Sequence, residues 1–291
     1  MTFSKTHAGA AALLIAIAIV QSPASAHADG NDTSSGIARA LAAGDARASD
    51  GTVSTFAGIT YGTDGGGNPA TGDCTTFVDS GNSINSAISS ANSGAVVCVR
   101  AGDYSSQLVS LTKSGVTVRS TGVGKIKGAE VRGDQSTLDG FTVVGGSANS
   151  PESGILVSGD SVKVLHNLVT GTNLIYGVLC AKGSCNNDLI SGNTVTGIES
   201  IGMKIENGAG TVVERNNIYD LHNDLGGSYD TDGMRFWGHQ TIRYNYIHDI
   251  NEFSSGNRHP HVDCFQTYNN GSESAGTLIE NNYCLRVSRQ C

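Results

Sequence analysis

The chain has 291 residues, a formal net charge of −8 and only 15% charged residues. This acidic balance argues against nucleic acid as a partner, because a phosphate backbone is bound by clustered Lys and Arg. The 39 glycines, four prolines and 6% aromatic residues favour many short strands joined by tight turns over a helical protein.

The first 28 residues have the features of a secretory signal peptide. Lys5 precedes an apolar run at 11–20, and small residues follow up to predicted cleavage after Ala26 or Ala28. The apolar run is too short to span a bilayer, and no later run is long enough. The sequence therefore predicts a secreted, extracellular protein without a membrane span, and we expect a monomer.

The segment 29–72 is rich in Gly, Ser and Ala and has no sustained period, so we interpret it as a flexible leader, with a first strand near 53–61. A single domain is predicted over 73–291. It begins with a short amphipathic helix, which Gly94 ends and whose apolar face is formed by Ile84, Ala87, Ile88 and Ala91. A strand at 96–99 and a turn at 101–104 are expected next.

Seven cysteines in an exported chain indicate disulfides, because the ligand spacing of a zinc cluster is absent. Cys74 and Cys98 flank the helix and are expected to pair. Cys264 and Cys284 lie on the same or adjacent repeats and are a second candidate pair. For Cys180 there are two readings, a bridge to Cys185 or a buried free thiol. Cys291 ends the sequence immediately after an open repeat, which predicts either a C-terminal fragment or a cysteine whose partner is missing.

A repeat dominates the rest of the chain. Its unit is an apolar residue, two spacers, Asn, one spacer and another apolar residue, and the Asn positions lie 26, 23, 29 and 37 residues apart. These positions are Asn167, Asn193, Asn216, Asn245 and Asn282. A single coil of this size cannot bury its apolar side chains, whereas coils stacked about 4.8 Å apart can. Stacking would also align the asparagines as an internal, structural ladder.

Each repeat carries a second strand that begins with a small residue. These first residues are Gly154, Gly177, Gly202, Gly233 and Cys264. The helix, the turn and this pattern resemble right-handed parallel β-helix proteins, the pectate-lyase-like superfamily, over roughly 74–291. The resemblance implies an all-β right-handed parallel solenoid with a short N-terminal capping α-helix. It leaves the chemistry open, since this superfamily includes lyases, hydrolases, epimerases, esterases and adhesins.

Aligning the second strands places titratable residues side by side. Asp232 and Asp263 precede their small residues and should lie one strand spacing apart, near 5 Å, with Asp230 beside His261. A single Asp before Gly is often only a turn cap. Two in register, with cations nearby, favour a catalytic site, so Asp232 and Asp263 are the first candidates for catalysis, and His261 and Asp230 follow.

The outward positions of the same strands suit substrate binding. Alternation sends Met234 and Phe236 inward, so the next residues along face solvent. The predicted binding residues are Lys204, Arg235, Gln266, Glu206, Trp237 and Tyr268. Trp237 and Tyr268 would form a stacking platform for a sugar ring; alternatively, the loop at 250–260 covers Trp237 as ordinary packing.

A narrower resemblance concerns the reaction. Thr231-Asp232-Gly233 and Asp263-Cys264-Phe265 are similar to motifs of polygalacturonase-type glycoside hydrolases, which implies hydrolysis of a polysaccharide. The match is partial. Asp230 stands where that family has Asn, Val262 replaces its proposed general acid, and its Gly-His-Gly and Arg-Ile-Lys motifs are absent.

Two alternatives remain. A polysaccharide lyase would use β-elimination on a uronic-acid polymer, with Ca²⁺ held by Asp230, Asp232 and Asp263 and a base drawn from Lys204, Arg235 or His261. A non-enzymatic adhesive solenoid would only bind the glycan. His222 and His248 are expected to be surface turn residues.

Overall fold

The computed structural model describes residues 54–56, 59–61, 71–180, 185–206, 208–222, 230–250, 261–268 and 276–288. The predicted signal peptide lies outside them, as does most of the leader, where two short antiparallel strands pair, β1 (Ser54–Phe56) and β2 (Ile59–Tyr61). Within the described ranges, no helix has the length and apolar character needed to cross a membrane.

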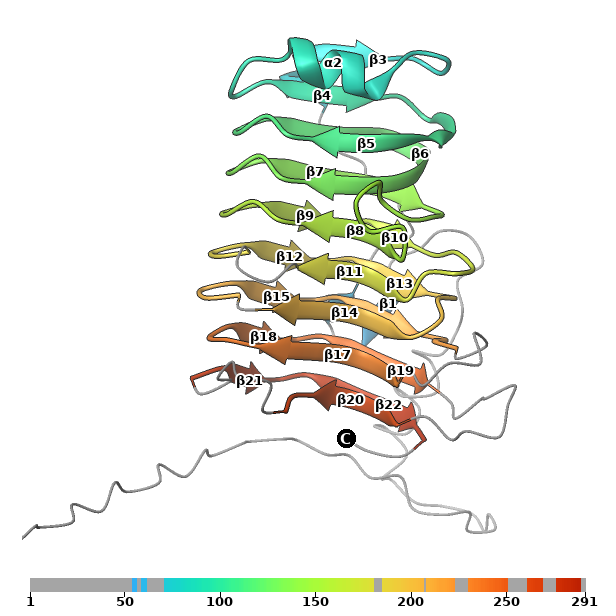
Figure 1. The fold of residues 1–291 in the computed structure, drawn as a ribbon, viewed down its shortest axis with the longest axis vertical. Coiled ribbons are helices and arrows are strands. Elements are labelled where there is room, and N and C mark those ends of the chain that lie inside the picture. The colour runs from blue at the N-terminus through green and yellow to red at the C-terminus, as the bar shows by residue number, and fades with distance from the viewer. Residues whose placement is uncertain are drawn as a thin grey trace, which may run out of the picture.

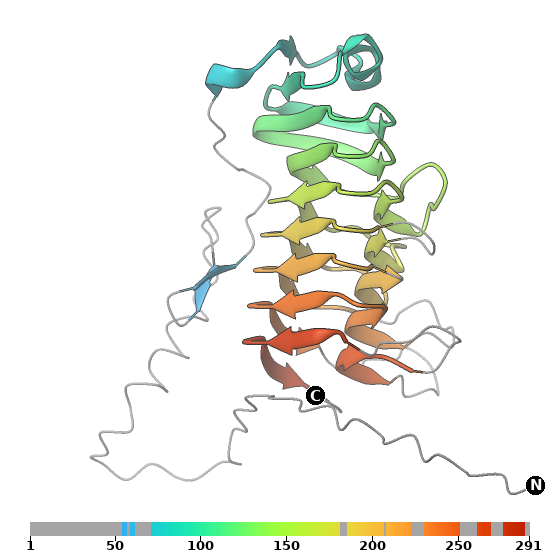
Figure 2. The same cartoon turned by 90° about the vertical axis from the view of Figure 1, so that its left-hand side faces the viewer.

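The domain is a parallel β-helix, which confirms the predicted architecture (Figures 1 and 2). Each coil passes through three faces, and each strand pairs in parallel with its counterparts in the neighbouring coils. The long strands β5 (Gly102–Leu111), β6 (Thr117–Val131) and β7 (Thr137–Val143) turn corners and contribute to more than one face.

The first face continues from β5 and β6 into β8 (Ser153–Val157), β11 (Tyr176–Cys180), β14 (Ile201–Glu206), β17 (Thr231–Trp237) and β20 (Val262–Gln266). The second comprises β3 (Thr76–Val78), β4 (Val96–Val99), parts of β6 and β7, β9 (Lys163–Leu165), β12 (Leu189–Ser191), β15 (Val212–Glu214), β18 (Thr241–Arg243) and β21 (Leu278–Glu280). The third contains parts of β5, β6 and β7, then β10 (Leu168–Val169), β13 (Thr194–Thr196), β16 (Asn217–Tyr219), β19 (Tyr246–Ile250) and β22 (Tyr283–Val287).

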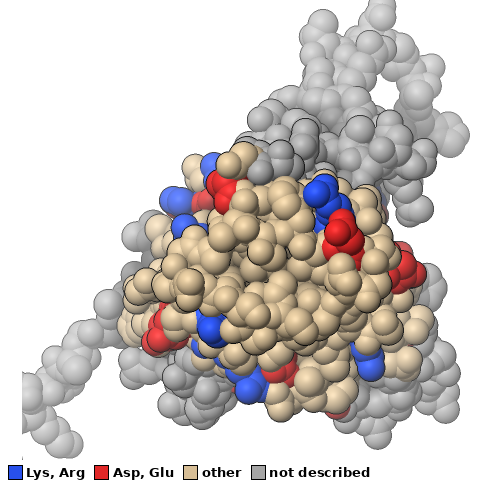
Figure 3. All heavy atoms as spheres, turned by 90° about the horizontal axis from the view of Figure 1, so that it is seen from above, with Lys and Arg blue, Asp and Glu red and all other residues tan. Residues whose placement is uncertain are grey.

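The helix α2 (Ile84–Ser90) lies over the N-terminal end of the stack (Figure 1). Ser83 caps it by accepting a hydrogen bond from the backbone N–H of Ser86 at 3.2 Å, and Ile84 and Ile88 are buried beneath it. A short 3-10 turn, η1 (Thr71–Asp73), precedes β3. Seen from this end, the middle of the surface lacks charged side chains and the charges lie around the rim (Figure 3).

The predicted turn at 101–104 is wrong in part, because β5 already begins at Gly102. Residues 102–104 pair with 124–126 of β6, so this stretch is the first strand of a coil. Tyr104 is 1% exposed, and its hydroxyl donates to the carbonyls of Val78 at 3.3 Å and Arg100 at 3.1 Å.

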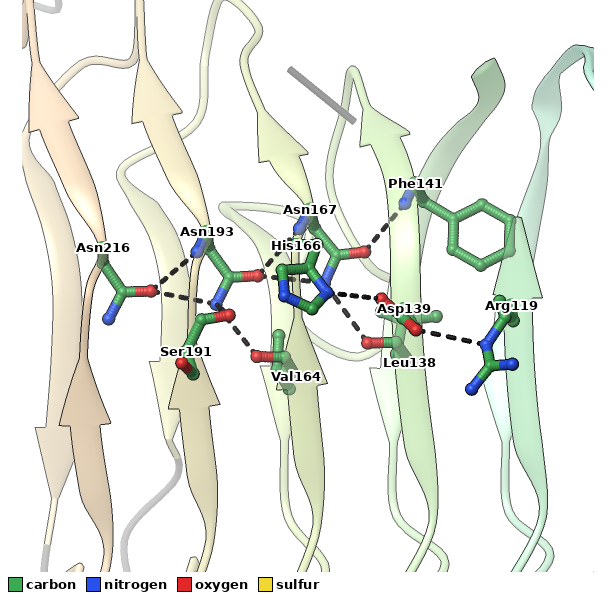
Figure 4. A network of polar contacts seen from close by, with 10 residues as sticks. All are labelled: Arg119, Leu138, Asp139, Phe141, Val164, His166, Asn167, Ser191, Asn193 and Asn216. Carbon is green, nitrogen blue, oxygen red and sulfur yellow. Dashed lines mark hydrogen bonds and ion pairs between the residues drawn. The ribbon is translucent and has the colours of Figure 1, made fainter. Parts of the chain in front are cut away.

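The predicted asparagine ladder is present (Figure 4). The Oδ1 atom of Asn193 accepts from both the backbone N–H and the Nδ2 of Asn167, each at 3.0 Å, and Asn216 receives the same pair from Asn193 at 2.9 and 3.0 Å. The pattern continues through Asn245 to Asn282. Each amide therefore fixes the corner of one coil against the next.

Three disulfides are formed within the described residues. The pairs Cys74–Cys98 and Cys264–Cys284 confirm the predictions. Cys180 pairs with Cys185, so the bridge is correct and the free-thiol reading is wrong. Cys291 lies outside the described residues.

Candidate functional site

The site residues come from the outer surface of β14, β17 and β20, and a glycine determines which side chains reach it. A Cβ on Gly233 would lie 2.5 Å from Cγ2 of Ile247, a core residue, so this position faces inward. Met234 also faces the core and is fully buried. Because two successive positions point inward, Asp232 and Arg235 point outward together, although simple alternation would separate them.

The predicted register is confirmed. Asp232 pairs with Asp263, and Lys204, Arg235 and Gln266 follow one another across three strands. The backbone N–H of Thr231 donates to the carbonyl of His261 at 2.8 Å, which keeps the row of Asp230 and His261 aligned. The side chain of His261 is exposed.

Arg235 is occupied by the acidic residues of its own strand. Its Nε and Nη2 donate to Oδ2 of Asp232 at 3.0 and 2.5 Å, and Nη2 also donates to Oδ2 of Asp230 at 3.1 Å. The Asp232 side chain is 0% exposed and that of Arg235 is 14% exposed. Arg235 therefore holds the two carboxylates in place, and we revise its predicted role as a substrate-binding cation.

The two central carboxyls are perturbed by burial. Burial outweighs the attraction of Arg235 and raises the pKa of Asp232 to about 7. It also raises the pKa of Asp263, against a 3.3 Å hydrogen bond from Nε2 of Gln266. Two adjacent Asp carboxyls, one of which is protonated near neutral pH, are suited to sharing a proton. They are also suited to binding a cation that displaces this proton.

Four buried side-chain oxygens in this pair of strands have no hydrogen-bond partner: Oγ1 of Thr231, Oδ1 of Asp232, Oδ1 of Asp263 and Oε1 of Gln266. The last three belong to carboxyl or amide groups. Buried acceptors are satisfied in nearly all proteins, so such a group is suited to a proton, a water or a bound cation.

The predicted metal set of Asp230, Asp232 and Asp263 needs correction. In the described residues, Cys180, Cys185 and Asp188 form the set of three whose ligand atoms all lie within 4.8 Å of one another. Asp230 and Asp232 instead have the guanidinium of Arg235 between them. Asp232, Asp263 and Gln266 are the oxygen donors that remain.

Lys204 on β14 pairs with Arg235 on β17 and so lies beside the acidic cluster. Its Nζ is 2.8 Å from Oε1 of Glu206, 5.3 Å from the ring centroid of Tyr176 and 5.9 Å from that of Trp237. Both charged side chains are about one fifth exposed, at 20% and 22%. Tyr176 occupies the same row as Asp232, two coils earlier. The predicted register placed it there, but nothing in the sequence indicated that its ring lies next to Lys204.

The platform prediction is wrong for Trp237, which is 1% exposed. Its Nε1 donates to the carbonyl of Tyr268 at 2.7 Å, and the Tyr268 ring packs edge-on against it with centroids 5.0 Å apart. Tyr268 itself is 51% exposed. A sugar can therefore reach Tyr268, whereas Trp237 supports it from beneath. The alternative reading invoked the loop at 250–260, of which residues 251–260 lie outside the described residues.

The two remaining histidines differ. His222 follows β16, is partly exposed and lies 3.8 Å from Asp220, as expected of a turn residue. The turn prediction is wrong for His248, which belongs to β19 and stacks between Tyr219 and Tyr246 with centroid distances of 5.0 and 4.0 Å.

Comparison with known proteins gives little beyond this geometry. No protein-family model and no curated protein matches the chain. Among solved structures, it is similar to a PL6 family polysaccharide lyase from Pseudopedobacter saltans, at 16% identity and a TM-score of 0.48. The match covers 60% of this chain and 46% of the lyase, so the chain spans less than half of that structure.

Proposed function

We propose that this chain is an exported enzyme that cleaves an acidic polysaccharide by β-elimination at the outer face of β14, β17 and β20. The observation that carries the proposal is the group of unpartnered acceptors on Asp232, Asp263 and Gln266. These are hard oxygen donors without a hydrogen-bond donor, which suits Ca²⁺. The Ca²⁺ would neutralise the substrate carboxylate and so acidify the adjacent C–H.

The charge of the site supports the same view. Four acidic residues, Glu206, Asp230, Asp232 and Asp263, lie beside two cations, Lys204 and Arg235. Both cations are already paired with carboxylates. The excess of carboxylates would repel a uronic-acid polymer unless a bound cation offsets it. We therefore expect the activity to depend on a metal ion.

The remaining residues take roles according to their exposure. His261 is exposed at the edge of the Asp pair, and an imidazole is a common general base, so we assign it the removal of the proton next to the substrate carboxylate. The electron pair then forms the C=C bond as the glycosidic C–O bond breaks, and the leaving oxygen takes up a proton from water. Lys204 and Tyr268 contact the sugar, and Arg235 orients Asp232.

Hydrolysis is the second candidate, and the raised pKa values of Asp232 and Asp263 favour it. A pair sharing one proton resembles the acid and base of glycosidases. However, an Asp232 side chain with 0% exposure cannot contact a glycosidic oxygen. We therefore place hydrolysis second.

The test is a product assay on acidic and neutral polysaccharides with and without a Ca²⁺ chelator. Elimination gives unsaturated products that absorb in the ultraviolet and are one water lighter than hydrolysis products, and a chelator should stop it. Hydrolysis products that resist the chelator would overturn the proposal, and binding without products would indicate an adhesin.

A matched pair of variants assigns the site. Asp263→Asn should abolish turnover in a folded chain. Asp139→Asn removes an Asp of similar burial, 8% exposed against 5% for Asp263, which contacts Arg119 at 3.2 Å on a different face, and should leave turnover unchanged. Equal losses in both variants would mean that folding, not chemistry, was affected.

A further inference from the structure

A separate buried cluster lies where β11 ends and β12 begins. Cys180 ends β11, Asp188 precedes β12, and Cys185 is disulfide-bonded to Cys180. The three residues are 0%, 0% and 2% exposed for Cys180, Cys185 and Asp188. Their Sγ and carboxylate oxygen atoms all lie within 4.8 Å of one another. A carboxylate thus faces two sulfur atoms in a site without solvent contact.

Only half of the Asp188 carboxylate has a hydrogen-bond partner. Oδ1 accepts from the backbone N–H of Val162 at 2.7 Å, whereas Oδ2 is buried without a partner. The backbone N–H of Asp188 donates to Oγ1 of Thr211 at 3.2 Å, which fixes the residue in place. Holding Val162 needs only one acceptor, and an amide would supply it, as Asn167 does for Phe141 at 3.0 Å. The second, orphaned oxygen is thus unexplained by the fold and points to a ligand.

We propose that Cys180, Cys185 and Asp188 form a redox-controlled site for a thiophilic divalent cation such as Zn²⁺, closed when the disulfide is formed and open when it is reduced. Zinc takes thiolate sulfur at about 2.3 Å and carboxylate oxygen at about 2.1 Å, which places tetrahedral ligand atoms roughly 3.5–3.8 Å apart. Breaking the S–S bond lets the two sulfur atoms separate to this spacing, which is shorter than the 4.8 Å that already encloses the three ligand atoms. The fourth position would be taken by a water that enters when the site opens on reduction.

The reduced state also has a defined acceptor without metal. Sγ of Cys185 lies 3.4 Å from the carbonyl of Val157, so a free thiol can donate there. With a phosphine reductant, the S–S bond breaks, phosphorus is oxidised to the phosphine oxide with an oxygen from water, and the two protons of that water remain on the thiols. Metal binding then releases these two protons as the thiolates form.

The experiment is a titration of the full chain with Co²⁺, a spectroscopic substitute for Zn²⁺, before and after anaerobic phosphine reduction. The reduced wild type should bind one Co²⁺ per chain with a sulfur-to-cobalt charge-transfer band that Zn²⁺ abolishes. The oxidised wild type should show no such band. Asp188→Asn keeps the acceptor for Val162 and both sulfurs, and should weaken binding by about tenfold or more.

Controls separate this cluster from the other cysteines. A Cys74→Ser/Cys98→Ser double variant should keep the band after reduction, whereas Cys185→Ser should lose it. Circular dichroism of each variant verifies the fold, and if Cys185→Ser does not fold, Asp188→Asn decides. No band in the reduced wild type, an equal band in the oxidised chain, or wild-type affinity in folded Asp188→Asn would each overturn the proposal.

Discussion

Replacing Asn193 by Ala tests whether the asparagine ladder holds the coils together. The side chain accepts two hydrogen bonds from Asn167, and its Nδ2 donates to the carbonyl of Val164 at 2.9 Å and to Oδ1 of Asn216 at 3.0 Å. All four are buried. At about 1 kcal/mol for each bond, and more where a buried group loses its last partner, we expect Asn193→Ala to lower the free energy of unfolding by about 4 kcal/mol.

Urea-induced unfolding measures this value, because Trp237 is the single tryptophan, is buried, and reports by fluorescence on a nearby coil. Asn82→Ala is the control, since this Asn is exposed, and we expect a change within about 0.5 kcal/mol. Asn193→Asp keeps the acceptors but turns both donations into oxygen–oxygen repulsions, so it should destabilise at least as much as Asn193→Ala. A loss below about 1 kcal/mol for Asn193→Ala would refute the ladder argument.

Three further outcomes are expected. Gly202→Ala places a Cβ 2.5 Å from Cγ2 of Ile218 and 2.6 Å from a backbone oxygen of the next coil, and should cost about 1–3 kcal/mol in urea unfolding. Hydrogen bonds from Arg286 hold the pKa of Asp249 at about 2, below its unfolded value of about 3.9. The ionised Asp249 therefore stabilises the fold above pH 4, and this stabilisation is lost as the pH falls through 2. Arg286→Leu should flatten this acid limb of the melting temperature. The pKa of Asp232 is raised to about 7, so its contribution is greatest below pH 4 and declines as pH rises through 7; Asp232→Asn should remove that decline, and an unchanged profile would contradict the assignment.

The register was predictable because physical constraints repeat in it. The asparagine at each corner of the ladder bonds to its counterpart in the next coil and to a backbone carbonyl of the previous one. A glycine recurs where a Cβ would meet the next coil, as at Gly177, 2.6 Å from the oxygen of Gly202. These two markers align every strand, and Asp232 is placed over Asp263 as a consequence.

Side-chain accessibility was not predictable in the same way. The burial of Trp237 and the capture of Arg235 by Asp232 depend on contacts made across the glycine and between coils, and alternation alone treats the positions as equivalent. Asp188 was missed for a related reason. A Cys, Cys and Asp combination has no established spacing signal, and only the fold shows that one of its oxygens is buried without a partner.

The position of the candidate site follows from coil length as well as from the glycines. Its Asp pair lies on β17 and β20, the strands within the two longest ladder intervals, 29 and 37 residues. Insertions in a solenoid cost little in closure entropy, since each doubling of loop length adds about 0.6 kcal/mol. The stack can therefore tolerate long connections next to these strands, while the ladder keeps the strands themselves in register. The earlier coils, with intervals of 26 and 23 residues, carry Tyr176 and Ile201 in the equivalent row and lack the carboxylates. We infer that the repeat supplies a rigid register, and that chemistry is concentrated where the connections have grown.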